Sequence, residues 1–142
     1  MYEKVLFATD LLPETECVAV RAKQIADFHN AELYMIHVVE NLPAIYASPM
    51  VFDVESTIYQ EAKKGMKELA KNIGIDFDKQ CKVELGSIKE EALNYAKAIK
   101  CDLIIVGSHS KHGLAFILGS NANSLLDVAP CDVLAIKTEV DK

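Results

Sequence analysis

Residues 102–107 read DLIIVG, the most apolar strand that the sequence predicts. A continuous apolar run of this length, ended by glycine, is typical of a strand buried on both faces of a sheet. The segment that follows, 107–120, reads GSHSKHGLAFILGS and is rich in glycine, serine and histidine. Glycine lets backbone N–H groups approach an anion closely, and Gly119-Ser120 directly precede an expected helix. This strand and its continuation therefore indicate both a fold class and a candidate anion site.

Apolar runs and helical patterns alternate along the rest of the chain. Further strands are expected at 4–9 (KVLFAT), 32–39 (ELYMIHVV), 81–85 (CKVEL) and 132–137 (DVLAIK). Helical spacing of apolar residues predicts helices from Pro13 to Asn30, over 55–73, over 88–99 after a Ser87 cap, and over about 121–128. Residues 40–54, with Pro43 and Pro49, are expected to form a loop. Strands separated by helices predict an α/β fold, a parallel sheet with helices on both faces.

Length and charge limit the classes of protein to consider. The chain has 142 residues, 51% of them hydrophobic and 25% charged, so we expect one domain over 1–142. A net charge of −6 without a run of Lys or Arg argues against a partner that is a nucleic acid or a membrane. No apolar run approaches the ~20 residues of a membrane span, and no signal peptide is evident. We therefore expect a cytoplasmic location.

The four cysteines, at positions 17, 81, 101 and 131, are far apart in the sequence. They form no CxxC motif, and no histidine pair completes a metal-binding spacing. A chain of this length does not need disulfides to fold, so we expect reduced and mostly buried cysteines.

Polar residues follow two of the expected strands at their carboxyl ends. Thr9-Asp10 follow the first strand, and Gly107-Ser108-His109-Ser110 follow the fourth. In open parallel sheets, ligands bind beyond the carboxyl ends of the strands. The segment 107–120 is not a Walker A loop, and its composition also fits an ordinary connection in which Ser120 caps a helix. Asp10 likewise fits a helix cap as well as a ligand contact.

Residues 2 to 138 together resemble the universal stress protein family. The resemblance is carried by KVLFATD at 4–10, IHV at 36–38, DLIIVGSHS at 102–110, Gly119-Ser120 and PCDVLAIK at 130–137. It implies a Rossmann-like sheet of the adenine nucleotide alpha hydrolase-like type, with five strands in the order 3-2-1-4-5. In this order the first and fourth strands are neighbours, so Asp10 and Gly107 would flank one crevice. The resemblance also implies a homodimer formed through the last strand, at Val133–Ile136.

ATP-binding members of this family carry a motif similar to Gly-x2-Gly-x9-Gly-Ser/Thr in this region. Gly107 matches the first glycine, and Gly119-Ser120 match the final pair. Ser110 stands where the second glycine is expected, and eight residues separate it from Gly119. The resemblance therefore implies that ATP, with or without Mg²⁺, or a related adenine nucleotide is the ligand.

The resemblance also implies roles for individual residues. Ala8, Thr9 and Asp10 would border the adenosine, with the Asp10 carboxylate near the ribose, and Val38 would offer backbone groups to the adenine. Gly107, Ser108, His109 and Ser110 would line the ribose and phosphates, and Gly119, Ser120 and Asn121 would hold the phosphates. His37 lies within a strand and is expected to be a structural histidine.

The expected function is that of a stress-response protein in which an adenine nucleotide acts as a switch, read by a protein partner. Asp10 is the only carboxylate expected near the phosphates, so the sequence predicts no dedicated catalysis and at most slow ATP hydrolysis. The alternative is a dimeric interaction module that binds no nucleotide. Ser110 and the shortened spacing before Gly119 favour that alternative.

Overall fold

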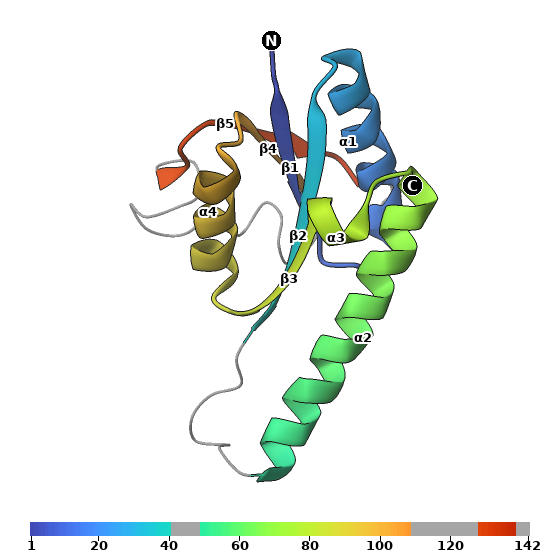
Figure 1. Cartoon of the computed structure of the whole chain (residues 1–142), viewed down its shortest axis with the longest axis vertical. Coiled ribbons are helices and arrows are strands. Elements are labelled where there is room, and N and C mark those ends of the chain that lie inside the picture. Colours follow the sequence, from blue (N-terminus) through green and yellow to red (C-terminus); the bar gives the residue numbers. More distant parts are fainter. Residues whose placement is uncertain (41–48, 109–127, 139–142) are drawn as a thin grey trace.

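Five parallel strands form a single sheet in the computed structural model, which describes residues 1–40, 49–108 and 128–138 (Figure 1). The strand order is β3-β2-β1-β4-β5, which confirms the order implied by the resemblance. In chain order the elements are β1 (Lys4–Ala8), the 3-10 helix η1 (Pro13–Thr15), α1 (Glu16–Phe28), β2 (Glu32–Glu40), α2 (Pro49–Ile73), α3 (Phe77–Gln80), β3 (Cys81–Gly86), α4 (Ile88–Ile99), β4 (Leu103–Gly107) and β5 (Asp132–Ile136).

Helices cover both faces of the sheet, as the sequence predicts. Helices α1 and α2 pack on one face and α4 on the other (Figure 1). Side chains of β1 alternate between the two layers: Val5 and Phe7 join the cluster with α1 and α2, whereas Leu6 and Ala8 join the cluster with α4. All four are buried. Because both faces are covered, the inner strands read as continuous apolar runs and not as alternating ones.

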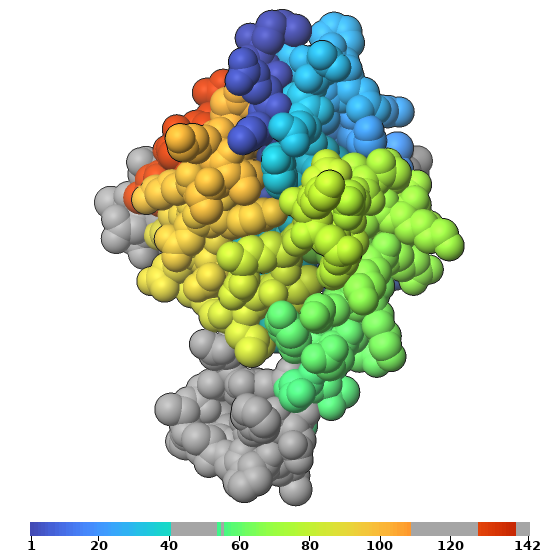
Figure 2. All heavy atoms as spheres, viewed as in Figure 1, coloured from blue at the N-terminus to red at the C-terminus, as the bar shows by residue number. Residues whose placement is uncertain are grey.

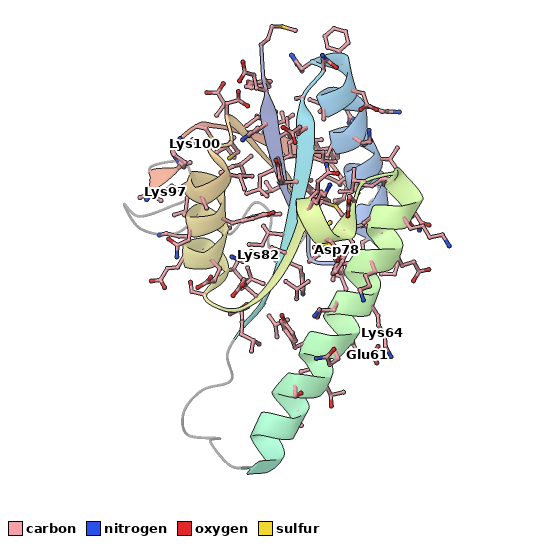
Figure 3. The ribbon with its side chains drawn as sticks, in the orientation of Figure 1. Glu61, Lys64, Asp78, Lys82, Lys97 and Lys100 are labelled. Atoms are coloured by element: carbon pink, nitrogen blue, oxygen red, sulfur yellow. The ribbon has the colours of Figure 1, made fainter. Side chains whose placement is uncertain are left out.

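The outer surfaces of the covering elements carry charges of both signs. Side chains from α2, α3, β3 and α4 cover much of the face shown in Figure 2. Six exposed charged side chains on these elements point away from the core (Figure 3); they are Glu61, Lys64, Asp78, Lys82, Lys97 and Lys100. Among the described residues, no helix is long and apolar enough to cross a membrane.

One local prediction of secondary structure is wrong, and one short helix was not predicted. Helix α2 begins at Pro49, so the last part of the expected loop at 40–54 is helical. Proline is tolerated in the first turn of a helix, where its missing N–H would have no partner, so Pro49 starts the helix and does not exclude it. The four-residue helix α3 was not expected; the Asp76 side chain caps it by accepting a hydrogen bond from the Asp78 N–H at 2.9 Å. Of the helix expected over 121–128, only Val128 lies within the described residues.

The cysteines are free thiols, but their burial differs from the prediction. Cys101 is buried, whereas Cys17, Cys81 and Cys131 are only half-buried. Cys81 begins β3, Cys101 lies two residues before β4, and Cys131 directly precedes β5, so these three lie at the amino edge of the sheet. Burial, together with the negative charge of Asp76, raises the pKa of the Cys81 thiol to about 12.

Candidate functional site

The candidate site lies where β1 and β4 end side by side. These strands pair in parallel, with Ala8 opposite Val106. The residues that follow, Thr9-Asp10 after β1 and Ser108 after Gly107 of β4, therefore lie at the same edge of the sheet. The topology thus brings together the two polar strand ends that the sequence singles out.

Thr9 connects this edge to β2 and is buried. Its N–H donates to the Ile36 carbonyl at 2.9 Å, and its hydroxyl accepts from the Leu11 N–H at 3.0 Å. The Nδ1 atom of His37 lies 2.8 Å from the Thr9 carbonyl oxygen. A carbonyl oxygen can only accept, so Nδ1 carries the hydrogen in this contact. His37 therefore has a hydrogen-bond partner within the fold, as expected of a structural histidine.

Asp10 uses one carboxylate oxygen for the local fold and leaves the other without a partner. Oδ1 accepts from the Leu12 N–H at 3.0 Å and lies 3.0 Å from the hydroxyl oxygen of Thr15. The Thr15 hydroxyl has a single hydrogen and also lies 2.7 Å from the Leu12 carbonyl oxygen. Oδ2 is buried and has no hydrogen-bond partner among the described residues. Buried polar atoms are nearly always paired, so this oxygen has an unmet capacity to accept a hydrogen bond.

Leu11 has a left-handed backbone with φ of +63°. This region is unfavourable for a residue with a branched side chain, and such strain is often found at functional sites. Two hydrogen bonds fix the turn around it: the Leu11 N–H to Thr9 Oγ1 and the Leu12 N–H to Asp10 Oδ1. Leucine gives no sequence signal for a positive φ, so the sequence analysis missed this turn.

Val38 lies beyond the last pair between β1 and β2, which joins Ala8 to Ile36. Two residues further along β2, Val38 therefore lies at the same edge of the sheet as Asp10. It pairs with Glu84 of β3, and its side chain is buried in the cluster under α4. Its side chain is part of the core, as the sequence predicts, so only its backbone is suited to a ligand contact.

Ser108 ties the end of β4 to the end of β5. Its N–H donates to the Ile136 carbonyl at 2.8 Å, and its Oγ accepts from the Thr138 N–H at 3.2 Å. Neither bond uses the hydrogen of the Ser108 hydroxyl. The Thr138 side chain is buried, and its Oγ1 has no hydrogen-bond partner among residues 1–40, 49–108 and 128–138. Thr138 is therefore a second polar side chain with an unmet hydrogen bond, which the sequence analysis did not identify.

The structure describes six of the eleven predicted site residues. Ala8, Thr9, Asp10, Val38, Gly107 and Ser108 all lie at the carboxyl edge of the sheet. The other five lie outside the described residues; they are His109, Ser110, Gly119, Ser120 and Asn121. Within the described parts of the chain, no group of three or more His, Cys, Asp or Glu side chains is arranged to hold a metal ion.

Comparison with protein families and curated proteins gives one consistent result. The family model described as "Universal stress protein family" matches residues 1–137. Universal stress protein A homolog 2 of Coxiella burnetii is 42% identical over 140 residues, covering 96% of this chain and 95% of that protein. Universal stress protein A homolog 1 of the same organism is 38% identical over 139 residues, covering 95% and 96%.

Solved structures of universal stress proteins share the fold. UspA from Lactobacillus plantarum is 26% identical with a TM-score of 0.72, covering 95% of this chain and 97% of that one. A universal stress protein in complex with cAMP is 23% identical with a TM-score of 0.60, covering 96% and 98%. A universal stress protein from Archaeoglobus fulgidus in complex with dAMP is 16% identical with a TM-score of 0.59, also covering 96% and 98%.

Proposed function

Because the chain belongs to the universal stress protein family, we propose that it binds an adenine nucleotide at the carboxyl edge of β1 and β4 and acts as a nucleotide-dependent switch in a stress response. ATP, with or without Mg²⁺, is the proposed ligand. The proposed setting is the cytoplasm. A protein partner would distinguish the loaded from the empty form.

The observation that carries this proposal is the unpartnered Oδ2 of Asp10. A carboxylate oxygen accepts hydrogen bonds, and a sugar hydroxyl is a suitable donor. A hydrogen bond to a charged acceptor contributes more to the free energy of binding than a bond to a neutral acceptor. Binding would also give a partner to an oxygen that is already buried. We therefore propose that a ribose hydroxyl of the nucleotide donates a hydrogen bond to Oδ2 of Asp10.

The ligands of two structural relatives support the same class of ligand. One relative was solved with cAMP and the other with dAMP. Each of these molecules contains adenine, a phosphate and one free hydroxyl on the sugar ring. A single donor is what the one unpartnered oxygen of Asp10 requires. ATP offers the same base, the ribose that cAMP also contains, and a longer phosphate chain.

The remaining proposed contacts follow from positions along this edge. Ala8 and Thr9 border the adenosine beside Asp10, and the Val38 backbone faces the adenine. The Ser108 hydroxyl, whose hydrogen is not used in the bonds to Ile136 and Thr138, would donate to the ribose or a phosphate, next in sequence to Gly107, His109 and Ser110. Gly119, Ser120 and Asn121 would complete the phosphate end, since they directly precede or begin the helix that the sequence predicts over about 121–128, and N–H groups at a helix start favour anions.

Nucleotide binding would act on the whole fold by mass action. A ligand that binds only the folded state stabilises it by about 2.7 kcal/mol when present at 100 times its Kd. The contacts proposed here join the ends of β1, β2 and β4, so loading would restrain this edge of the sheet. That difference between loaded and empty protein is what a partner would recognise.

A homodimer through β5 is a second part of this proposal. β5 lies at the edge of the sheet, and Leu134 on it is 38% exposed. An apolar edge strand favours pairing with a second copy of the same strand. This surface would serve equally in the alternative function, a dimeric interaction module that binds no nucleotide.

Calorimetric titration of the nucleotide-free protein with ATP, with and without Mg²⁺, tests the proposal in wild type and in Asp10→Asn. Asparagine keeps one oxygen to accept from the Leu12 N–H and places an NH₂ group at the Oδ2 position. We expect micromolar binding by the wild type and a loss of affinity of roughly 10- to 100-fold in the variant.

The matched control is Asp76→Asn, which changes another aspartate whose carboxylate accepts from the backbone N–H two residues further along the chain, near the amino end of β3. Its affinity for ATP should equal that of the wild type. Absence of heat in the wild type up to millimolar ATP would refute the nucleotide site and favour the interaction module.

A further inference from the structure

Two cysteines lie in contact at the amino edge of the sheet, opposite the edge that carries the candidate nucleotide site. Cys101 lies two residues before β4, and Cys131 directly precedes β5, which is paired with β4. Their Sγ atoms are 3.7 Å apart, although the residues are separated by 30 positions in the sequence. This distance is about van der Waals contact between two sulfur atoms, so no atom stands between them.

From this geometry we propose that Cys101 and Cys131 form a reversible intramolecular disulfide. The S–S bond of a disulfide is about 2.05 Å long, so the two sulfur atoms must approach by roughly 1.7 Å. Cys131 lies in the connection after Pro130 and outside regular secondary structure, where a change of side-chain rotamer is least restricted. The other two cysteines take no part in this bond.

The pair is accessible to a small reagent. A surface cavity of about 590 Å³ is lined by both cysteines and, among others, by Tyr2, His29 and Pro130. Cys131 is half-buried, whereas Cys101 is only 7% exposed. Cys131 is therefore the thiol that a reagent meets first, and Cys101 is the thiol that resolves the intermediate.

The reaction is thiol–disulfide exchange with a low-molecular-weight disulfide such as oxidised glutathione. The Cys131 thiolate attacks one glutathione sulfur, breaks the S–S bond and releases one glutathione as a thiol. The Cys101 thiolate then attacks Sγ of Cys131 in the mixed disulfide and releases the second glutathione. Two protein thiols are oxidised to one disulfide, oxidised glutathione is reduced to two thiols, and these take up the two protons.

The surroundings of the pair make this exchange slow at neutral pH. Burial is the largest cause that raises the pKa of each thiol, and the Asp102 carboxylate raises both further. The other residues with titratable groups that line the cavity are Met1, which carries the α-amino group, Tyr2, His29 and Asp132. Because the thiolate is the attacking species, few molecules react at any moment. The site is suited to sustained oxidising conditions and not to rapid peroxide sensing.

The disulfide would join the start of β4 to the start of β5 and close a loop that spans 30 positions. Closing a loop of this length restricts the unfolded chain more than the folded one. We expect the melting temperature of the oxidised protein to rise by about 10 °C, reversibly on reduction.

The test uses the full chain, incubated with oxidised or reduced glutathione and digested without reduction for peptide mass spectrometry. In the wild type, two of the four cysteines should lose their free thiols, and the peptides that contain Cys101 and Cys131 should be linked. The double variant Cys17→Ser, Cys81→Ser is the matched control and should form the same link with the same rise in melting temperature.

Two single variants remove the link from opposite sides. Cys131→Ser changes a half-buried position and should lose both the link and the rise in melting temperature. Cys101→Ala provides the same test at the buried position, with circular dichroism to check folding.

Four outcomes would each overturn the proposal. They are a stable glutathione adduct on Cys131, a link to Cys17 or Cys81, a link between two chains, and four free thiols after prolonged oxidation. The result does not depend on nucleotide binding, so the two proposals can fail independently.

Discussion

Asp10 shows how one side chain can serve the fold and leave a group for a ligand. From the sequence, a helix cap and a ligand contact were alternative interpretations of this residue. In the structure Oδ1 accepts from the Leu12 N–H at 3.0 Å in the turn before η1, while Oδ2 stays buried without a partner in the described part of the chain. The cap residues of η1 and α1 are Leu12 and Thr15, and neither helix start has a side-chain cap hydrogen bond, so Asp10 stabilises the turn and does not cap the helix.

Thr138 provides a residue-scale prediction about stability. Its hydroxyl is buried and has no hydrogen-bond partner among the described residues. Replacing the hydroxyl with a methyl group therefore removes a polar atom that folding takes out of water without giving it a new partner. We expect Thr138→Val to raise the free energy of unfolding by about 1 kcal/mol in ligand-free protein. Urea denaturation of the two proteins measures this difference. A lower stability of Thr138→Val would mean that the hydroxyl has a partner in the folded protein.

Several residues of the site region could not be found from the sequence, for identifiable reasons. Leu11 adopts φ of +63° without being Gly or Asn, the residues that normally indicate such a turn. Thr138 follows the last strand and becomes notable only because it is buried beside Ser108. The contact between Cys101 and Cys131 depends on the adjacency of β4 and β5, which spacing along the chain does not reveal.

At the scale of elements, the sequence predicted what depends on local pattern. Buried strands such as β4 were predicted because their apolar runs are continuous, and α4 was predicted from its spacing and its Ser87 cap, which accepts from the Glu90 N–H. The start of α2 was wrong because Pro49 fits both a loop and a first helical turn. The strand order was predicted from the family resemblance, since the alternation of strands and helices along the chain does not determine which strands are neighbours in the sheet.

The edge strand β5 provides an element-scale prediction about assembly. If two copies pair through β5, Leu134 is covered in the dimer, and a lysine there would bring an unpaired charge into the interface. We expect Leu134→Lys to weaken dimerisation by roughly tenfold or more, measured by sedimentation velocity over a concentration series.

Val20→Lys is the matched control for this measurement. Val20 is 43% exposed and lies on α1. A second control is Leu85→Lys, since Leu85 is 40% exposed, close to the 38% of Leu134, and lies on β3 at the opposite edge of the sheet. The sedimentation of both controls should match that of the wild type. Equal sedimentation of all four proteins would rule out pairing through β5.

At the scale of the whole molecule, a net charge of −6 opposes the approach of a polyanion such as ATP. Affinity must therefore come from local donors at the carboxyl edge of the sheet and not from the overall field. Charges of both signs on α2, α3, β3 and α4 fit this conclusion, because they form no uniform field on the face shown in Figure 3. We therefore expect the nucleotide to be recognised at the ends of β1, β2 and β4.

The most direct test of this claim is an NMR titration of isotope-labelled protein with ATP, followed through the backbone amides. We expect the largest chemical-shift changes at the amides of Thr9, Asp10, Val38, Gly107 and Ser108. The amides of Asp102 and Asp132, at the opposite edge of the sheet, should not shift. Shifts centred on the amino edge, or none up to millimolar ATP, would contradict this claim.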